Sequence, residues 1–277
     1  MPEGPASEAP LSRYVRPEST EEALDLLATG NWRILAGGTD FYPAQGNRPI
    51  RDDILDIDRL DGLAAIRLLD DHVLIGARAS WTDVLRADLP PSFDALKLAA
   101  REVGSIQIQN RGTVAGNLCN ASPAADGVPP LLTLDASVEL ASADGVRVLP
   151  LDDFILGNRK TARRPDELVV AVRFPVASPK AGYYFEEMTQ RHGDFAICAV
   201  AAVAEDNVVR LGVGGVAERS TVREWTGLAE VDIDDALNQY AWELGGSDDI
   251  HATAEYRRQL VRRLGRRAIL EARKCRK

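Results

Sequence analysis

The segment from Arg111 to Asp126 reads RGTVAGNLCNASPAAD and combines small residues, hydroxyl groups, two Asn amides and a terminal carboxylate. Amides and hydroxyls can both donate and accept hydrogen bonds, while glycine leaves the neighbouring backbone N–H groups open to a ligand. This combination suits a pyrophosphate and the hydroxyl groups of a ribose or ribityl chain. We therefore expect a ligand-binding loop in the middle of the chain.

A shorter segment, Leu35–Phe41 (LAGGTDF), has a related character and overlaps the apolar stretch 32–36. Two consecutive glycines permit positive φ and the close approach of a ligand. The Thr-Asp pair can cap a turn or helix whose N–H groups favour an anion. Either segment alone is more often a simple turn. Together they predict one binding site built from two loops.

A third glycine motif, Gly212–Ala217 (GVGGVA), matches the GxGxxA pattern of dinucleotide-binding folds. The residues after it show no apolar helical periodicity, and the sequence predicts no second parallel strand ending in an acid. We therefore expect these glycines to serve tight packing within a sheet.

The N-terminal part of the chain has the pattern of a small α/β unit. Ser19 and Glu22 form a capping box that predicts the start of a helix, and Gly30 is placed to end it. Short apolar stretches at 32–36 and 54–57 predict two strands.

Antiparallel hairpins dominate the pattern farther along the chain. Apolar stretches separated by short polar turns predict these hairpins, and helical stretches beginning at Ser80 and Ser92 can cover the resulting sheet. We expect an α+β fold with a boundary at the Pro-rich segment 175–179. The predicted hairpins are 66–69 with 73–77, 138–141 with 146–149, and 196–204 with 208–213. The predicted domains are residues 1–60, 61–176 and 177–277.

Composition and charge limit the function classes. The 277 residues are 45% hydrophobic and carry a net charge of −9, which argues against nucleic acid as the main partner. No apolar run approaches the ~18 residues needed to cross a membrane, and the N-terminus lacks a signal-peptide profile. We therefore expect a cytoplasmic protein without a membrane span. Residues 255–277 contain ten Lys or Arg and two Glu, which is typical of a solvated amphipathic helix or a subunit contact.

The sequence offers few metal ligands. Cys119, Cys198 and Cys275 are the three cysteines and lie far apart, whereas an iron–sulfur cluster usually needs four thiolates. The three histidines show no metal-binding spacing. We expect no metal ion or cluster on this chain.

At its two glycine-containing segments the sequence resembles the FAD-binding, or medium, subunits of the molybdenum hydroxylases. This family includes xanthine dehydrogenase and aerobic carbon monoxide dehydrogenase. The family motifs read approximately AGGTDL and TIGGNIxNASPxxD, and residues 36–41 and 113–126 match them in the same order. Further similar segments are 149–154, 164–168 and 190–196. The resemblance spans roughly residues 12–275, and the long second motif is specific.

The resemblance implies a PCMH-type flavoprotein fold: a small α/β subdomain, an antiparallel-sheet subdomain and a C-terminal sheet-plus-helices domain, with FAD between the first two. Residues 37–39 would present N–H groups to the pyrophosphate, and Thr113, Gly116 and Asn117 would close on it from the other side. The implied cofactor-binding residues are Leu35, Ala36, Gly37, Gly38, Thr39, Asp40, Phe41, Val103, Thr113, Ala115, Gly116, Asn117, Cys119, Asp126, Val169 and Glu187.

Three of these positions have implied places along the FAD molecule. Asp126 matches the family's acid near the adenosine half. Cys119 occupies a position that in relatives can lie against the isoalloxazine, and Val169 matches an apolar contact to the flavin.

Other positions depart from the family pattern. Ala115 replaces the first glycine of the usual GGN, and Val103 stands where some relatives stack an aromatic ring on the flavin. Glu186 and Glu187 stand where relatives often have a lysine close to the flavin.

The resemblance implies an FAD-dependent oxidoreductase subunit, in which the cofactor does the chemistry and the protein positions and tunes it. In the family a large subunit with molybdopterin hydroxylates the substrate, and a small subunit with [2Fe–2S] clusters relays electrons. FAD then passes the electrons to NAD⁺, a quinone or O₂. No catalytic side chain is assigned to the present chain. Two alternatives remain open, namely an accessory or assembly protein that has kept the fold, and a freestanding flavin oxidase.

Overall fold

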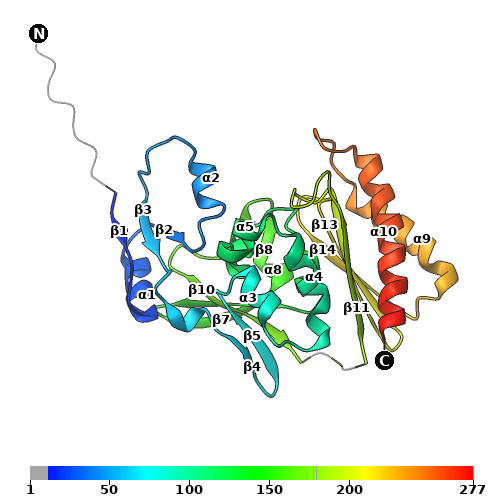
Figure 1. The fold of residues 1–277 in the computed structure, drawn as a ribbon, viewed down its shortest axis with the longest axis horizontal. Helices are drawn as coiled ribbons and strands as arrows, with labels where there is room; N and C mark the ends of the chain where they lie inside the picture. Colours follow the sequence, from blue (N-terminus) through cyan, green and yellow to red (C-terminus); the bar gives the residue numbers. More distant parts are fainter. Residues whose placement is uncertain (1–11, 177, 179, 277) are drawn as a thin grey trace, which may run out of the picture.

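The computed structural model describes residues 12–176, 178 and 180–276, and arranges them around three main β-sheets that follow one another along the chain (Figure 1). The α+β fold class predicted from the sequence is confirmed. The domain limits after residues 60 and 176 remain predictions. Positions 177 and 179 of the expected boundary at 175–179 lie outside the described residues. Among the described residues, none of the helices is long and apolar enough to cross a membrane.

The N-terminal sheet is parallel and has strand β3 at its centre. Its elements are β1 (Tyr14–Val15), α1 (Thr20–Thr29), β2 (Trp32–Leu35), the short helix α2 (Phe41–Gln45) and β3 (Asp53–Asp56), followed by a 3₁₀ turn (Asp61–Leu63). As predicted, the Ser19 side chain caps α1 by accepting a hydrogen bond from the Glu22 N–H at 3.1 Å. No residue range could be predicted for the strand before α1, because the two residues of β1 are too short to show an alternating pattern.

The five-stranded sheet is antiparallel in the order β4-β5-β10-β6-β7. Its strands are β4 (Ile66–Leu68), β5 (His72–Gly76), β6 (Ser137–Ser142), β7 (Gly145–Pro150) and β10 (Leu168–Pro175). The two predicted hairpins form its two halves. Strand β10 joins them, with Val172 opposite Ile75 on one side and opposite Val138 on the other. A two-stranded sheet lies nearby, made of β8 (Ile155–Gly157) and β9 (Lys160–Thr161).

Short helices cover this sheet. They are α3 (Trp81–Arg86), α4 (Asp94–Glu102), α5 (Ile106–Arg111), α6 (Val114–Asn120), α7 (Val128–Thr133) and α8 (Leu151–Phe154), with a 3₁₀ turn (Pro91–Phe93) before α4. Ser80 begins α3 with the predicted capping box, whose other member is Asp83. Leu96 and Ala100 of α4 pack into the same core as Phe174 of the sheet. The predicted helices from Ser80 and Ser92 are therefore confirmed.

The C-terminal sheet is antiparallel in the order β11-β12-β13-β14. Its elements are β11 (Gly182–Met188), β12 (Cys198–Glu205), β13 (Val208–Gly214), β14 (Thr221–Thr226), a 3₁₀ turn (Glu230–Asp232), α9 (Ile233–Leu244) and α10 (Ala254–Cys275). In β12, Cys198 and Val200 pack in a cluster with α9 and α10, whereas Ala199 and Ala201 pack in a cluster with α4. The strand is buried on both faces, which explains its almost unbroken run of Ala and Val.

The glycine motif at 212–217 serves packing, as predicted. A Cβ atom at Gly212 would lie 2.5 Å from the carbonyl oxygen of Pro129 in α7, and one at Gly214 would lie 3.0 Å from the ring of the same proline. Strand β14 follows the motif, where a dinucleotide-binding fold would need a helix. The missing side chains therefore let α7 approach β13 closely.

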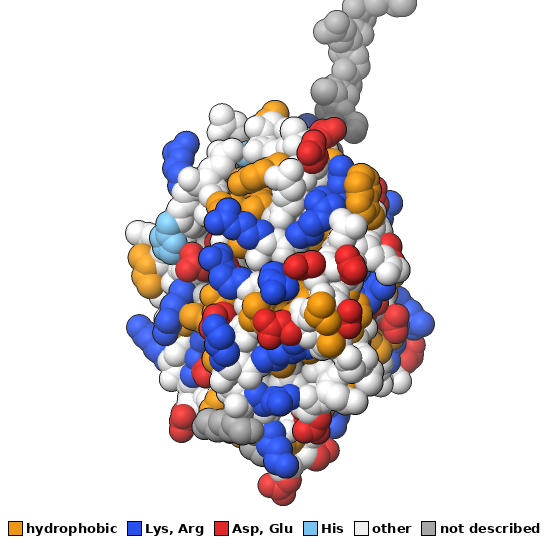
Figure 2. All heavy atoms as spheres, turned by 90° about the vertical axis from the view of Figure 1, so that its right-hand side faces the viewer, with side chains coloured by type: hydrophobic (Ala, Val, Ile, Leu, Met, Phe, Trp, Pro, Cys, Tyr) orange, Lys and Arg blue, Asp and Glu red, His pale blue; other side chains and the backbone are white. Residues whose placement is uncertain are grey.

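The basic C-terminal segment folds as α10, with Leu260, Leu264 and Ala268 buried as predicted. The face at the right of Figure 1 mixes Lys and Arg side chains with acidic ones (Figure 2). Arg257 departs from the expectation of a solvated arginine face, because it is only 4% exposed.

Candidate functional site

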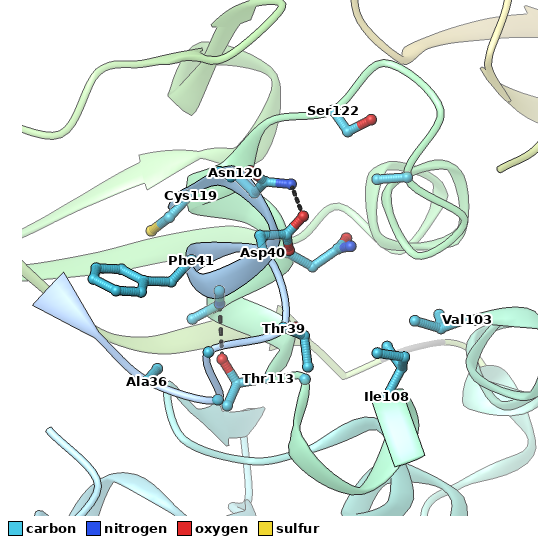
Figure 3. A pocket seen from close by; sticks show the side chains of 18 of the residues that line it. Ala36, Thr39, Asp40, Phe41, Val103, Ile108, Thr113, Cys119, Asn120 and Ser122 are labelled. Carbon is cyan, nitrogen blue, oxygen red and sulfur yellow. Dashed lines mark hydrogen bonds between the residues drawn. The ribbon is translucent and has the colours of Figure 1, made fainter. Parts of the chain in front are cut away.

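A cavity of about 1040 Å³ lies where the N-terminal sheet meets the helices of the middle region. Its volume is at the upper end of the range for small-molecule sites, which suits a long ligand. It contains every residue that the sequence assigned to cofactor binding except Glu187. Figure 3 shows Phe41 and Cys119 on one side of the cavity and Val103 and Ile108 on the other. Their contacts with FAD remain predictions.

The first glycine segment forms the turn between β2 and α2. Gly38 has φ +78°, a value that favours glycine. The N–H groups of Gly37, Gly38 and Thr39 donate to no acceptor within the described residues. A row of open backbone donors at a turn is well suited to bind phosphate oxygens.

The second segment differs from the loop that we expected, because residues 114–120 form helix α6. Thr113 is its N-cap residue, and its hydroxyl accepts the Gly116 N–H at 2.9 Å. The Val114 N–H donates to the Ala79 carbonyl. The Gly116 N–H is therefore occupied within the chain, and the assignment of Gly116 to FAD binding stays a prediction. The Ala115 N–H is the donor of this turn without a partner in the described residues.

The two segments are joined directly. An added Cβ at Gly37 would lie 1.8 Å from the Arg111 carbonyl oxygen, so the backbones are in contact there. Farther along, the Asn120 amide donates to Asp40 Oδ1 at 2.7 Å (Figure 3). Arg159 donates to the amide oxygen of the same asparagine. The two segments therefore approach each other as predicted. Residues of both also form hydrogen bonds within the protein that the sequence did not indicate.

Two kinds of surface complete this part of the cavity. Val103, Ile108 and Val169 form apolar walls. Asn117 supplies a polar group: its Oδ1 atom is buried and receives no hydrogen bond from the described residues. A buried acceptor without a donor is uncommon unless a ligand or water completes it. The open N–H groups, the apolar walls and this acceptor fit FAD, which combines phosphates, hydroxyls and a flat apolar ring.

A partly buried ion pair fixes the segment that brings Val169 and Arg163 to the cavity. Arg147 binds both carboxylate oxygens of Glu167, at 2.5 and 2.8 Å, and the Arg164 N–H donates to the same carboxylate. Burial acts to raise the pKa of Glu167, but these hydrogen bonds outweigh it and lower the pKa. Arg163 lines the cavity, where the sequence had not placed a cation.

The C-terminal region also reaches the cavity, which the sequence did not predict. Residues 190–191 and 193–195, in the turn between β11 and β12, line it together with His251. The segment was noted for its similarity to the family, but nothing in its local pattern indicates contact with a site built from residues far away in sequence. The cavity is therefore bounded by all three parts of the chain, and not by the first two alone.

Glu187 lies outside the cavity lining, and its assignment as a cofactor contact stays a prediction. It stands behind Asp126, whose side chain lines the cavity and is 6% exposed. The described residues contain no group of three or more His, Cys, Asp or Glu placed to hold a metal ion.

Cys119 faces the cavity as an unreactive thiol. Although the side chain is exposed within the cavity, the surrounding protein desolvates it and raises the pKa of the thiol to about 11, an effect that nearby Arg163 partly offsets. The group is therefore neutral at pH 7, which suits the apolar contact with the flavin that the sequence predicts.

Replacement of Cys119 by alanine is expected to leave FAD affinity within about tenfold of the native value, or about 1.4 kcal/mol. The physical reason is that only a small packing contact is removed. Titration with FAD, followed by the change in flavin fluorescence, measures this. Cys198→Ala is a control at a buried cysteine away from the cavity. Loss of FAD from Cys119→Ala alone would show that the thiol has a specific role.

Comparison with known proteins agrees with this geometry. Residues 9–177 match the family described as the FAD binding domain in molybdopterin dehydrogenase. The chain is 33% identical over 280 residues to the 6-hydroxypseudooxynicotine dehydrogenase complex subunit alpha of Paenarthrobacter nicotinovorans, with 95% of each chain covered. It is 32% identical over 279 residues to the glyceraldehyde dehydrogenase medium chain of Sulfolobus acidocaldarius, with 95% of this chain and 98% of the relative covered.

A solved structure supports the same assignment. The fold is similar to a chain of the reconstituted CO dehydrogenase from Oligotropha carboxidovorans, with a TM-score of 0.86 and 27% identity over 95% of this chain and 98% of the other. The match extends over the C-terminal region as well as the family domain. The chain belongs to the family of FAD-binding domains of molybdopterin dehydrogenases and is an FAD-binding oxidoreductase subunit of the medium-chain type.

Proposed function

We propose that this chain holds FAD non-covalently in the cavity between its three sheets and acts as the electron-exit subunit of a heteromeric molybdenum hydroxylase. In this role it receives electrons from a [2Fe–2S] subunit and passes them to NAD⁺, a quinone or O₂, while a molybdopterin subunit carries out the hydroxylation. The names of the relatives, among them a dehydrogenase complex subunit and a medium chain, support a multi-subunit assembly.

The observation that carries the proposal is the meeting of the two glycine segments at one cavity. The open N–H groups of residues 37–39 and of Ala115 would hold the pyrophosphate, because backbone donors at turns and helix starts favour anions. Val103, Ile108 and Val169 would cover the flavin and exclude water from it. Bound FAD supplies the ability to accept an electron pair and release it to an acceptor.

Two cations among the charged groups of the lining would favour the electron-rich form of a flavin. Arg163 and Arg191 both line the cavity. A cation beside a flavin stabilises negative charge on the reduced ring, and its effect is greater where water is excluded. These arginines would take the place of the lysine that many relatives have at the position of Glu187.

The purified chain is expected to contain FAD and neither iron nor molybdenum. Acid precipitation should release the flavin into solution, because the sequence has no residue pattern for a covalent flavin link. Visible absorption, mass analysis of the released flavin and metal analysis measure these properties. Flavin that stays with the precipitated protein, or iron in stoichiometric amount, would contradict the proposal.

Co-expression with candidate partner subunits distinguishes the proposed electron-exit subunit from an accessory protein and from a freestanding flavin oxidase. An electron-exit subunit should co-purify with iron–sulfur and molybdopterin subunits, and the complex should reduce an acceptor only when FAD is bound. An accessory protein could be colourless, and a freestanding oxidase would reduce its flavin with a small substrate when no other subunit is present. Stopped-flow reoxidation of the reduced complex by NAD⁺, a quinone and O₂ identifies the acceptor.

A further inference from the structure

Two carboxyl groups meet behind the wall of the cavity. Asp126, in the segment between α6 and α7, is 6% exposed and lines the cavity. Glu187 lies on β11 and faces away from α10, whereas the adjacent Glu186 pairs with Arg267 of α10. The two carboxyl groups lie close enough for each to act on the pKa of the other.

The protein supplies no donor to this pair. Oδ1 of Asp126 and both carboxyl oxygens of Glu187 are buried and receive no hydrogen bond from the described residues. Ionised carboxylates can only accept hydrogen bonds, so two of them in contact, with no donor between them, repel each other. A hydrogen bond between them requires a proton on one of the two.

The surroundings of the two carboxyl groups favour their protonated forms. Burial, the charge of Glu187 and its hydrogen bond raise the pKa of Asp126 well above its ordinary range. Burial also raises the pKa of Glu187, to about 7, and the charge of Glu102 adds to this. The hydrogen bond with Asp126 and the nearby His192 act in the opposite direction. His192 is itself engaged with Glu102, 2.9 Å away on α4.

We propose that Asp126 and Glu187 share one proton, and that this proton holds Asp126 in place at the wall of the FAD cavity. Glu187 is then a positioning residue for FAD, acting through Asp126 without touching the cofactor. This inference rests on the proposed function for its effect on FAD, but the shared proton itself is a property of the chain alone.

Loss of the proton shared by Asp126 and Glu187 sets the direction in which FAD affinity changes with pH. Above about pH 7 Glu187 is ionised and the remaining proton lies on Asp126, whose pKa burial and the charge of Glu187 raise well above its ordinary range. When this last proton is lost at higher pH, two buried carboxylates repel each other at the cavity wall. Asp126 is displaced and a further negative charge faces the anionic pyrophosphate. FAD should therefore bind more weakly as the pH rises.

Titration with FAD at several pH values tests the proposal. For the native chain we expect the Kd for FAD to rise at least about tenfold between about pH 7 and pH 10, since one pH unit of linked proton loss corresponds to a factor of about ten. In Glu187→Gln the amide donates to Asp126 without a titrating proton, so the Kd should change by less than about threefold over the same range. Glu186→Gln is the matched control, because it removes the same charge one residue away on the opposite face of β11. It should keep the native pH dependence.

Thermal unfolding of the FAD-free chain provides a second readout. A carboxyl whose pKa is raised on folding binds more protons in the folded state, so stability falls as the pH rises from the ordinary Glu value of 4.5 to about 7. Glu187→Gln should flatten this part of the Tm profile, and Glu186→Gln should not. Equal pH profiles of Kd and Tm for the native chain and Glu187→Gln would overturn the proposal.

The two readouts separate this inference from the proposed function. If FAD binds at no pH, the proposed function and the positioning role both fail, while the Tm profile still shows whether the proton is shared. If FAD binds but its Kd does not depend on the pH in the native chain, the positioning role fails and the proposed function stands.

Discussion

Gly37→Ala is expected to yield a chain that is purified without FAD. The added methyl carbon would lie 1.8 Å from the Arg111 carbonyl oxygen, which belongs to the backbone and cannot rotate away. The turn carrying Gly38 and Thr39 would have to move from the start of α6, and the open N–H groups on the two sides would no longer face one ligand. FAD affinity should fall by at least about a hundredfold, or about 2.7 kcal/mol.

The same change should also lower the thermal stability. Overpacking at a tight contact costs roughly 1–3 kcal/mol, and loss of FAD removes about 2.7 kcal/mol of linkage stabilisation when free FAD exceeds its Kd a hundredfold. At roughly 2–4 °C per kcal/mol, the Tm should fall by about 10 °C relative to the native chain with FAD. Visible absorption and scanning fluorimetry measure the two effects.

Gly62→Ala is the control for this experiment, because a Cβ atom there meets nothing within 4 Å. It should keep its FAD, and its Tm should change by no more than about 2 °C. A Gly37→Ala chain with native colour and Tm would show that the two segments do not form one site.

Arg257→Ala is expected to cause the largest loss of stability without direct damage to the FAD contacts. The side chain is 4% exposed and donates to the carbonyl groups of Ile197, Gly215 and Ser247 and to the Asp249 carboxylate. Truncation leaves buried acceptors without their donor and a cavity in the core. Each buried carbonyl group left without a donor costs about 1–3 kcal/mol, so the loss of the bonds to Ile197 and Gly215 should lower the Tm by about 10 °C.

Circular dichroism during heating measures this effect. Arg263→Ala is the matched control, since this arginine is exposed on the same helix, and its change should stay within about 0.5 kcal/mol. FAD should still bind to Arg257→Ala at low temperature, because the side chain does not line the cavity. A native Tm for Arg257→Ala would mean that α10 is held to the sheet by its apolar face alone.

Local patterns were reliable where residues close in sequence determine the structure. The cap of α1 at Ser19, the capping box of α3 and the hairpin turns form from neighbouring residues, and each was predicted correctly. The GVGGVA motif was also interpreted correctly, because the pattern after it lacks the periodicity of a helix. No range could be predicted for β1, where two residues are too few for a pattern, and the prediction failed at α6, where small polar residues hide a helical turn.

The candidate site likewise combines features that residues close in sequence determine with features that depend on residues far apart in sequence. The two glycine segments could be selected from the sequence, since their composition exposes backbone donors, and the structure places them side by side. The 190–195 turn, Arg163 and His251 could not be selected, because they reach the cavity only through the stacking of the sheets.

The sequence by itself determined the family, the α+β class and the two segments that line the cavity, because each depends on a local motif. Only the tertiary structure decided how those segments contribute. It assigned the Gly116 N–H to the Thr113 hydroxyl and placed Glu187 outside the cavity lining, close to Asp126. Hydrogen bonds and burial depend on residues brought together from distant parts of the chain. The charge and donor state of each group at the cavity therefore follow from packing that no local pattern encodes.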